Sequence, residues 1–303
     1  MIHLPIRLEI YGHQHPYGQP PAPNAVASRR LSQSQPFPIQ RLLLYVNGMI
    51  LDTTALDTTT RAIATRFALL YSHASIWIMT GVLIAAIAFI ILHWTMMLPL
   101  LIIAGIGGQM LTEYNIHRFI FHLPPPKNQR AFNALYLCHY GHHDFPTNPK
   151  LFFVPIWFML PVLIAGFLIY WAIFAILGFT DALPMAVAFV FVGHVMTFLG
   201  YEWYHMTAHL NIRKFAPEVA VTRRHNMHHF KDFSKMFHVS YGGHIIDRAM
   251  GTEIDPDRRD RLSRTEFIRT LGMKPDDPRL VLARETFASK LNLTEQQRLT
   301  AQR

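Results

Sequence analysis

Two long stretches of the chain carry almost no charge, and they determine its predicted architecture. Residues 74–112 contain no Lys, Arg, Asp or Glu, and residues 151–201 contain a single formal charge, at Asp181. A membrane-crossing helix needs roughly 20 apolar residues, so each stretch has the length of a helical hairpin. Buried helices of a soluble protein are the alternative, but soluble cores rarely run so long without a charge. We therefore predict four membrane-spanning helices, near residues 75–94, 96–116, 152–177 and 183–203.

The segment before the first hairpin predicts two different elements. Residues 1–40 are rich in Pro, Gln and His and contain no apolar run, so we expect a loosely ordered arm in which His13 and His15 are solvated. Residues 41–73 mix Leu, Ala and Ile with scattered Arg and Thr. This mixture suits a helix that lies along a membrane surface.

The charged segment after the second hairpin predicts a helical cap. Helical spacing is visible near residues 263–271 and 278–291. The predicted division is a cytoplasmic arm with an interfacial helix, a membrane catalytic domain and a charged helical cytoplasmic tail, at residues 1–73, 74–252 and 253–303. The predicted fold is an all-α integral membrane protein: four transmembrane helices in two hairpins, with a cytoplasmic cap that holds a histidine-rich dimetal site.

The distribution of charge predicts which side of the membrane the cap occupies. The net charge is +9, and every Lys and Arg lies in residues 1–73, 117–150 or 205–303. Basic residues concentrate on the cytoplasmic side of membrane proteins, so both termini and the middle loop are expected there. The bacterial inner membrane and the endoplasmic reticulum both fit. The chain has no nucleic-acid-binding motif, and its one cysteine, Cys138, excludes an intramolecular disulfide.

Histidines repeat in a fixed order after each hairpin. A spaced pair lies at the exit of the hairpin, and a His-x-x-His-His cluster follows it. Pair and cluster are separated by 22 residues in the first copy, from His117 to His139, and by 20 in the second, from His205 to His225. These ten of the 18 histidines are the candidate metal ligands: His117, His122, His139, His142, His143, His205, His209, His225, His228 and His229.

Helical geometry explains why this spacing suits a metal. Positions i, i+3 and i+4 lie on one face of a helix, so we expect each cluster to aim three imidazoles at one point. His117 and His122 are about 140° apart on an ideal helix, so one is expected where the helix ends before Pro124-Pro125-Pro126. Ten imidazoles suffice for two metal ions at about five each, with coordination positions left open. Iron is favoured because an open site beside a membrane suggests oxygen activation, although imidazole also suits zinc.

Several other polar residues are candidates for supporting roles. Metal-bound imidazoles usually donate their second N–H to a carboxylate or a carbonyl, so carboxylates near the ligands are candidates for this role. The alternative is that they are ordinary carboxylates at the membrane interface. Buried or site-adjacent histidines are candidates for lining the pocket. His194 lies inside the fourth span, where we expect it either to form an interhelical hydrogen bond or to line the pocket. The supporting candidates are Glu113, Glu202 and Asp144, and the pocket candidates are His194, His238 and His244.

The histidine motifs resemble those of the fatty acid hydroxylase and sterol desaturase superfamily, particularly its fatty acid 2-hydroxylase branch. The matching segments are Glu113-Tyr-Asn-Ile-His-Arg-Phe-Ile-Phe-His122, Cys138-His-Tyr-Gly-His-His-Asp-Phe-Pro146, Gly200-Tyr-Glu-Trp-Tyr-His-Met-Thr-Ala-His209, Arg224-His-Asn-Met-His-His-Phe230 and the closing Asp247-Arg-Ala-Met-Gly-Thr252. The resemblance covers roughly residues 75–252 and implies that the ten histidines are the ligands. It also implies a dimetal enzyme, most often with iron, that uses O2 and electrons to hydroxylate or desaturate an unactivated C–H bond of a lipid.

The chain departs from the 2-hydroxylase pattern at its N-terminal side. Many of those enzymes carry a fused cytochrome b5 domain with a His-Pro-Gly-Gly haem motif, and His15-Pro-Tyr-Gly is not that motif. We therefore expect electrons from a separate cytochrome b5-like or ferredoxin/reductase partner. Three functions remain open at this point: lipid hydroxylation, lipid desaturation, and metal transport or sensing. The third fits least because the spans offer almost no polar residues for an ion path.

Overall fold

The computed structural model describes residues 8–9, 43–46, 49–52, 58–254 and 264–299. The chain divides into two units, Met1–Ala68 and Leu69–Arg303. The first unit contains three antiparallel strands and the beginning of one helix. In the second, every described helix or strand element is a helix, and turns and loops connect these helices. Most of the predicted N-terminal arm, including His13 and His15, lies outside the described residues.

The first unit corrects the prediction of a helix over residues 41–73. Strands β1 (Leu8–Glu9), β2 (Leu43–Val46) and β3 (Met49–Asp52) pair antiparallel in the order β1-β2-β3. Among the described residues of this segment, only Thr58–Leu70, which form α1, are helical. The sequence Asn47-Gly48 lies between β2 and β3, and this dipeptide is typical of hairpin connections. That local signal outweighs the helical mixture of apolar and polar residues.

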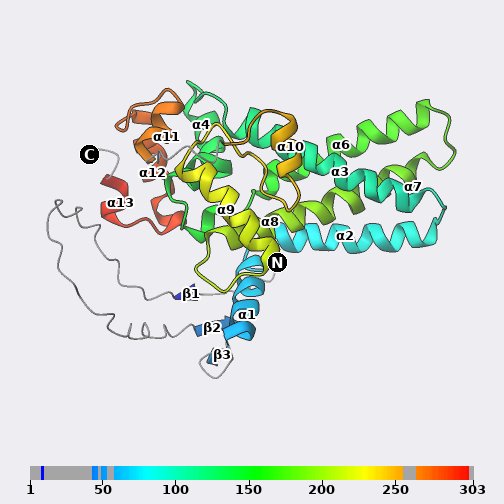
Figure 1. Ribbon diagram of the computed structural model, residues 1–303, viewed down its shortest axis with the longest axis horizontal. Coiled ribbons are helices and arrows are strands. Elements are labelled where there is room, and N and C mark those ends of the chain that lie inside the picture. The colour runs from blue at the N-terminus through cyan, green and yellow to red at the C-terminus, as the bar shows by residue number, and fades with distance from the viewer. Residues whose placement is uncertain (1–7, 10–42, 47–48, 53–57, 255–263, 300–303) are drawn as a thin grey trace, which may run out of the picture. The chain divides into compact units, whose positions relative to one another are not determined.

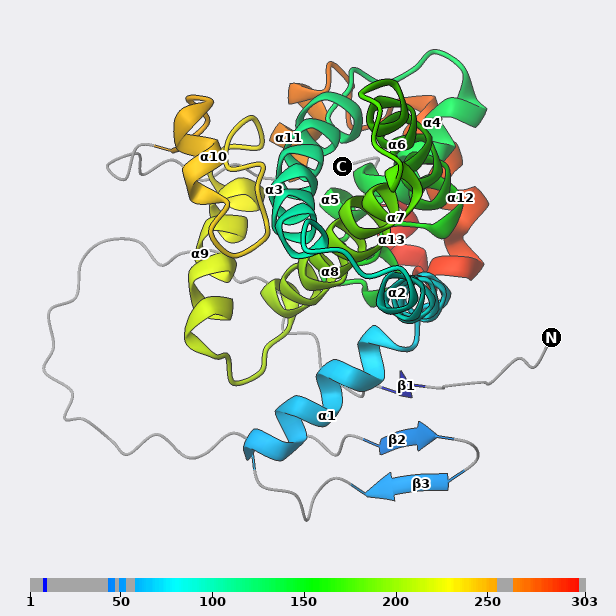
Figure 2. The same ribbon diagram turned by 90° about the vertical axis from the view of Figure 1, so that its right-hand side faces the viewer.

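Long helices lie at the four positions that the hydrophobic pattern predicts. They are α2 (Ala74–Leu92), α3 (Leu98–Ile116), α6 (Ile156–Ile176) and a continuous helix formed by α7 (Ala182–Ala186), η5 (Val187–His194) and α8 (Val195–His209). Figure 1 shows them extending side by side away from the histidine-bearing end, and Figure 2 views them nearly end-on.

Three described segments are long and apolar enough to cross a membrane: Ala74–Leu92, Pro149–Ile176 and Ala182–His209. The helix α3 is not among them. Its second half carries Gln109, Glu113 and Asn115, which lower its hydropathy, and two of these side chains, Gln109 and Glu113, are buried inside the bundle.

Two glycines allow α3 to lie directly against the fourth helix. A Cβ atom at Gly193 would lie 2.7 Å from the carbonyl oxygen of Ile102 and 2.8 Å from Cα of Gly105. A Cβ at Gly105 would overlap the backbone of Phe189. Small residues permit this close packing of helix backbones, as they commonly do inside membranes. The contact fixes the spacing between the two helices that carry the first histidine of each copy.

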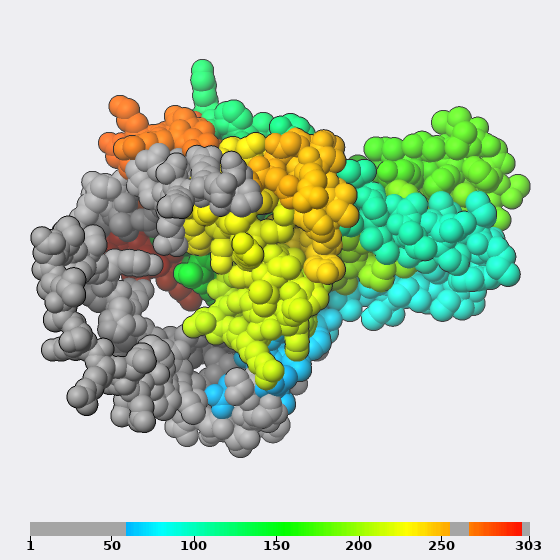
Figure 3. All heavy atoms as spheres, in the orientation of Figure 1, coloured from blue at the N-terminus to red at the C-terminus, as the bar shows by residue number. Residues whose placement is uncertain are grey.

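The cap surrounds the end of this bundle with short helices. It contains the π-helices η2 (His117–Phe121) and η3 (Tyr136–Tyr140), the 3-10 helix η4 (Pro149–Leu151), and helices α4 (Gln129–Leu135), α5 (Gly141–Asp144), α9 (Ala216–Phe230), α10 (His244–Ala249), α11 (Arg264–Thr270), α12 (Pro278–Leu291) and α13 (Glu295–Leu299). Helix η2 ends before the triple proline, as predicted. Figure 3 shows α9 and α10, in yellow and orange, on the surface of the cap beside the projecting apolar helices.

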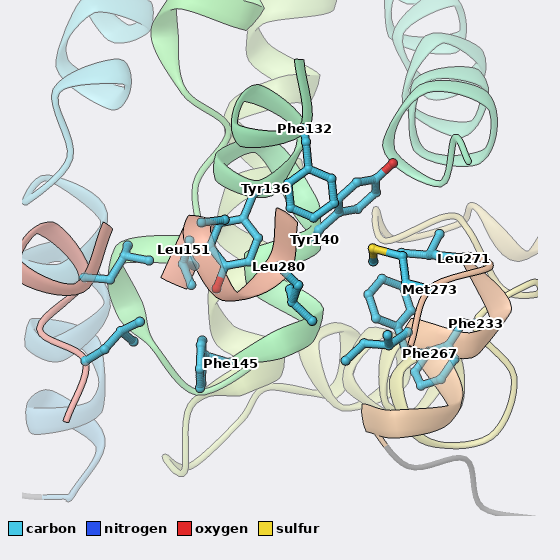
Figure 4. Packing of buried hydrophobic residues seen from close by; sticks show 14 residues of the cluster. Phe132, Tyr136, Tyr140, Phe145, Leu151, Phe233, Phe267, Leu271, Met273 and Leu280 are labelled. Carbon is cyan, nitrogen blue, oxygen red and sulfur yellow. The ribbon is translucent and has the colours of Figure 1, made fainter. Parts of the chain in front are cut away.

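The C-terminal helices are held to the cap by an aromatic and aliphatic cluster. Phe132, Tyr136 and Tyr140 form one side of it, and Phe267 and Leu280 come from α11 and α12 (Figure 4). All five side chains are almost completely buried. The helices α11 and α12 confirm the helical spacing predicted near residues 263–271 and 278–291. Burial of this size contributes several kcal/mol and places the tail directly behind the first histidine cluster.

Candidate metal centre

The structure brings all ten predicted histidines together in two groups of five. Within each group, one ring nitrogen of every histidine lies within 4.8 Å of those of the others. Almost all ten side chains are buried. The first group contains His117, His122, His139, His143 and His228, and the second contains His142, His205, His209, His225 and His229.

The Nε2 atoms converge in the first group. Nε2 of His139 lies 3.0 Å from that of His117 and 3.1 Å from that of His122. It lies 2.9 Å from that of His143, which is 3.2 Å from Nε2 of His228. Five nitrogens of one kind therefore meet around one small volume.

The second group has the same arrangement. Nε2 of His142 lies 2.9 Å from that of His205 and 3.1 Å from that of His229. Nε2 of His225 lies 2.8 Å from that of His209 and 3.0 Å from that of His229. The Nε2 atom of a neutral imidazole either carries one proton and donates, or carries none and accepts. Because several of these Nε2 atoms lie close to two or three others, the close contacts cannot all pair a donor with an acceptor. A shared cation would satisfy these converging lone pairs, so the donor set fits one metal ion in each group.

The prediction that each cluster aims three imidazoles at one point is wrong. The middle histidine of each cluster belongs to the group that the rest of its cluster does not form. His142, from the first cluster, lies in the second group, and His228, from the second cluster, lies in the first group. Positions i and i+4 are about 40° apart around a helix, whereas i+3 and i+4 are about 100° apart. The i+3 ring is therefore displaced to one side, about 60° from i and 100° from i+4, and it lies in the neighbouring group.

The spacing of five between His117 and His122 is matched by a change of helix type. Residues His117–Phe121 form a π-helical turn, and His122 follows it directly. Because hydrogen bonds in a π-helix run from i to i+5, residues five apart lie nearly above one another. Both imidazoles thus enter the first group. The prediction of a helix end before the prolines is confirmed, and the wide turn accounts for the inward direction of both rings.

Backbone carbonyls fix the ring orientation of three histidines. Nδ1 of His205 donates to the carbonyl oxygen of Phe152 at 2.7 Å, and Nδ1 of His228 donates to that of Lys235 at 2.6 Å. Nδ1 of His117 donates to the carbonyl oxygen of Phe237. A proton held on Nδ1 leaves the lone pair of Nε2 free to face the group. These carbonyl oxygens carry no signal in the sequence, because every residue has one.

Glu113 does not accept directly from a histidine of either group, contrary to the expectation of a carboxylate bonded to a ligand. Its Oε1 accepts from the backbone N–H of Val239 at 2.7 Å and of Ser240 at 3.0 Å. Its Oε2 accepts from Oγ of Ser240 at 2.5 Å. The carboxylate therefore holds the segment that supplies the carbonyl of Phe237 to His117, and it positions the imidazole through that segment.

Glu202 has the corresponding role beside the second group. Its Oε1 accepts from the backbone N–H of Val154 at 2.9 Å, two residues after the carbonyl that binds His205. Its Oε2 is buried without a hydrogen-bond partner among the described residues. Glu202 thus holds the segment before α6 as Glu113 holds the segment before α10, but with fewer hydrogen bonds.

Asp144 follows His143 directly and forms a buried ion pair with the C-terminal tail. Its two carboxylate oxygens accept from Nε and an Nη of Arg284, each at 2.6 Å. Tyr136 donates its hydroxyl to the same carboxylate at 3.0 Å. Asp144 therefore does not contact the imidazoles as expected; it fixes the short helix α5, which carries two of them, to α12.

Burial keeps the imidazoles neutral. It lowers the pKa of the eight grouped histidines outside the long apolar helices: His117, His122, His139, His142, His143, His225, His228 and His229. Next to burial, the nearby His143 lowers the pKa of His139 and His229 most. Neutral imidazole is the form that binds metals, so the environment favours the ligand state.

The three other candidate histidines lie outside both groups. His238 is buried. Its Nδ1 lies 3.1 Å from Oε1 of Glu113, and its Nε2 lies 3.1 Å from the carbonyl oxygen of Met110. His244 is exposed at the start of α10, so its predicted place in the pocket is not supported. His194 lines a cavity inside the bundle.

Two cavities lead from the first group into the apolar helices. The first, about 30 Å3, is lined by Glu113, His117, Phe198 and Tyr201 among others, and it is large enough to hold water. The second, about 300 Å3, lies farther along the bundle. Gln109 and Met159 line both cavities. The cavities are therefore adjacent, and together they extend from His117 into the bundle. Sequence reasoning missed Gln109, although a polar amide within an uncharged apolar stretch is a recognisable signal.

Comparisons with known proteins agree with this geometry. The profile of the fatty acid hydroxylase family matches residues 102–252. This part of the chain belongs to the fatty acid hydroxylase family. The family segment begins within α3, ends at Thr252 and includes all ten grouped histidines.

Two characterised relatives of this fatty acid hydroxylase segment agree with the 2-hydroxylase branch. The ceramide very long chain fatty acid hydroxylase SCS7 of Saccharomyces cerevisiae is 29% identical over 158 residues, which are 50% of this chain and 38% of the yeast protein. The fatty acid 2-hydroxylase of Rattus norvegicus is 28% identical over 138 residues, which are 45% of this chain and 34% of the rat protein. The matches thus span well under half the length of either relative.

One solved structure shares the fold. It is that of full-length scs7p, in which only the hydroxylase domain is visible. The two structures superpose with a TM-score of 0.52 and 22% sequence identity, over 65% of this chain and 69% of the other. The likeness supports the arrangement of bundle and cap described above.

Proposed function

We propose that this chain is a membrane-embedded lipid hydroxylase that uses O2 and two metal ions. The two groups of five histidines would hold these ions, and iron is the metal that we favour. The observation that carries the proposal is the position of the first group. It lies at the end of an apolar helix bundle and beside cavities that extend into that bundle. The family relationship and the two hydroxylase relatives support the same reaction class.

The proposed membrane arrangement has four spans: α2, α3, α6 and the continuous α7–η5–α8. The absence of Lys and Arg from the hairpin turns supports a cytoplasmic cap, because basic residues favour that side. The polar side chains of α3 are compatible with a span because Gln109 and Glu113 face the interior of the bundle. The cap is then within reach of soluble electron donors.

The residues of the chain would act mainly by holding geometry. Iron bound by the imidazoles would supply the chemistry that reduces O2 and attacks an alkyl C–H bond. The carbonyls of Phe237 and Phe152 hold His117 and His205 in the tautomer that presents Nε2. Glu113 and Glu202 hold the segments that carry those carbonyls. Phe198 and Tyr201 narrow the cavity beside His117 and exclude bulk water from the alkyl chain.

The electrons come, in this proposal, from a separate cytochrome b5-like protein or from a ferredoxin with its reductase. The lipid substrate is a fatty acid, a fatty-acyl lipid or a sterol-like molecule. Both proposals are tested in one assay. The purified full chain is placed in lipid nanodiscs with iron, each donor system in turn, and isotopically labelled O2.

Mass spectrometry of the lipids then decides among the functions. A product that gains one labelled oxygen atom supports hydroxylation. A product that loses two hydrogens identifies a desaturase, and metal flux across liposomes without any lipid change identifies a transporter. The variant His142→Ala should abolish product formation, whereas His244→Ala, which changes an exposed histidine outside both groups, should leave it unchanged.

A further inference from the structure

The larger cavity lies between α3, α6 and η5, in the apolar part of the bundle. Most of its lining is apolar and comes from α6, including Val162, Leu163 and Ile169. Ile169 is 57% exposed on the outer surface of the bundle, so the cavity borders the region where lipid would lie. Its volume of about 300 Å3 is about ten times the 30 Å3 of the first cavity. An apolar segment of a lipid chain fits this space.

Two of the polar side chains in this lining are buried. Gln109 is 4% exposed and His194 is 7% exposed, and both line this cavity. Oε1 of Gln109 and Nε2 of His194 have no hydrogen-bond partner in the part of the chain that the structure describes. A buried polar atom without a partner costs about 1–3 kcal/mol. Two such atoms, on side chains that line one cavity, are best explained by a ligand that pairs with them.

The backbone makes room for this pair. A Cβ atom at Gly108 would lie 2.8 Å from Nε2 of His194, so only glycine lets the imidazole lie against α3. Thr112, another polar residue of the lining, is already satisfied, because its hydroxyl donates to the carbonyl oxygen of Gly108 at 2.9 Å. Among the fully buried side-chain atoms of the lining, the unpaired hydrogen-bonding capacity is therefore confined to Oε1 of Gln109 and Nε2 of His194.

The chemistry of the two atoms selects a hydroxyl group. A hydroxyl donates one hydrogen bond, which suits Oε1 of Gln109, and accepts others, which suits an N–H at Nε2 of His194. A carbonyl group can only accept and would leave Oε1 unpaired. A carboxylate would bring a full charge into the apolar bundle at high cost. A neutral hydroxyl has both the donor and the acceptor that the two side chains require.

The position along α3 separates this pair from the histidine groups. Gln109 precedes His117 by eight residues, which corresponds to about 12 Å along a helix. A lipid whose hydroxyl pairs with Gln109 and His194 would therefore present to the first group a carbon several positions away from that hydroxyl. The pair would then determine which carbon of the lipid chain is oxidised.

We propose that Gln109 and His194 bind a hydroxyl group of the lipid inside the membrane bundle and thereby set which carbon of the chain reaches the first histidine group. This inference rests on the proposed lipid hydroxylase function, because it takes the cavity as the substrate's binding site. It adds the chemical class of the substrate's buried end, a neutral hydroxyl, and names the two residues that select it.

The test compares two probes that differ only at the far end of the chain. Binding of palmitate and of ω-hydroxypalmitate is measured on the full, metal-loaded chain in nanodiscs, without O2 or an electron donor, so that no turnover occurs. We expect ω-hydroxypalmitate to bind about tenfold more tightly. In Gln109→Met and in His194→Leu the two probes should bind with nearly equal affinity. Because each variant supplies its own ratio of two affinities, a partial loss of folded protein does not change the result.

Thr112→Val is the matched control. It removes a polar group from the same cavity, but one that is already paired, so the preference for the hydroxyl should remain. Equal affinity of the two probes for the parent chain, or an unchanged preference in both Gln109→Met and His194→Leu, overturns the proposal and leaves water as the partner of these side chains.

The two proposals fail separately. Lipid oxidation without any preference for the hydroxylated probe retains the hydroxylase function and rejects the hydroxyl site. A preference without oxidation of any lipid retains the site and rejects the hydroxylase. Under turnover, mass spectrometry of ω-hydroxypalmitate should place the new oxygen several carbons from the existing hydroxyl, and Gln109→Met should spread it over more positions.

Discussion

The two histidine groups contain the same number of imidazoles but reach it with different backbone geometry. In the second group, the pair His205 and His209 lies four residues apart on the regular α-helix α8. In the first group, His117 and His122 lie five residues apart across the π-helix η2. One extra residue is accommodated by a wider turn, and both pairs still face their group. Ligand spacing therefore indicates the local type of helix rather than the position of a break.

The two groups also differ in how firmly their supporting segments are held. Glu113 accepts three hydrogen bonds from Val239 and Ser240, and both of its oxygens are used. Glu202 accepts one hydrogen bond, from Val154, and its second oxygen has no partner among the described residues. The segment that positions His117 is thus more tightly anchored than the one that positions His205. The difference suggests unequal tolerance of the two groups to substitution.

The largest expected effect comes from the two histidines that cross between clusters. His142→Ala removes a ligand from the second group, and His228→Ala removes one from the first, although each residue belongs by sequence to the other copy. Each variant should lose more than the ~100-fold in activity that is typical when only a ligand-orienting residue is lost. Its metal content, measured by elemental analysis, should fall as well.

The control for this pair is His244→Ala, which alters an exposed histidine outside both groups. Its activity and metal content should match those of the parent chain. If His142→Ala and His228→Ala both kept full metal content, the assignment of these residues as exchanged ligands would be wrong.

The next effect concerns the cap and the tail. Asp144 and Arg284 form a buried ion pair, and their side chains are only 2% and 1% exposed. Asp144→Asn or Arg284→Met removes one of the two charges and leaves the other buried without its counter-charge. We expect the free energy of unfolding to fall by about 3–5 kcal/mol, because the remaining group stays buried. Denaturant unfolding in detergent, followed by tryptophan fluorescence, measures the change.

An exposed ion pair of the same kind supplies the comparison. Arg248 is 72% exposed and pairs with Glu253 at 3.0 Å. Arg248→Met should lower the free energy of unfolding by less than about 1 kcal/mol, because solvent screens the pair. Equal losses for Arg248→Met and Arg284→Met would show that the tail is not anchored through Asp144.

The smallest of the three effects tests the unequal anchoring of the two groups. Glu113→Gln places an amide N–H2 opposite donors, so at least one of its three hydrogen bonds is lost. Metal affinity should fall about 10–100-fold. Glu202→Gln keeps an oxygen for the N–H of Val154, and only its unpaired oxygen becomes an amide, so its effect should be smaller. Competition with a chelator measures both affinities.

A larger loss of metal affinity in Glu202→Gln than in Glu113→Gln would contradict this order. The matched control is Glu253→Gln, on the surface of the cap, which contacts Arg224 and Arg248 and neither histidine group. It should leave metal affinity unchanged.

Much of the site was predictable because its chemistry is carried by side chains at regular spacing. Two copies of a spaced pair and a His-x-x-His-His cluster identified all ten histidines that the structure groups. The four long helices followed from uncharged stretches whose length alone sets their number. The prediction worked where one physical property, hydropathy or imidazole spacing, dominated the local sequence.

The exchange of His142 and His228 could not be predicted from the same pattern. Helical spacing gives the angle between two rings, but it does not say what lies on each side of the helix. The π-helical turns have no distinct composition, and the carbonyls of Phe152 and Phe237 have no side-chain signature. These features depend on contacts between segments far apart in the chain.

Two further differences had signals that the hydrophobic pattern obscured. The strands β2 and β3 flank Asn47-Gly48, a hairpin dipeptide within a segment read as helical. Gln109 stands as a polar residue in an uncharged stretch, and its buried, unpaired oxygen gives it significance only in three dimensions. In both places a short local signal was outweighed by the average character of its surroundings.

The crossing of the clusters has a consequence for how metal enters the protein. His142 and His143 are consecutive residues with ring centroids 5.9 Å apart, yet they serve different groups, and the same holds for His228 and His229 at 5.6 Å. An ion that orders one group immobilises the helical turn that carries ligands of the other. The second ion then binds a backbone whose entropy is already reduced, which makes loading positively cooperative. A metal titration should show one steep transition, with little half-loaded protein at its midpoint.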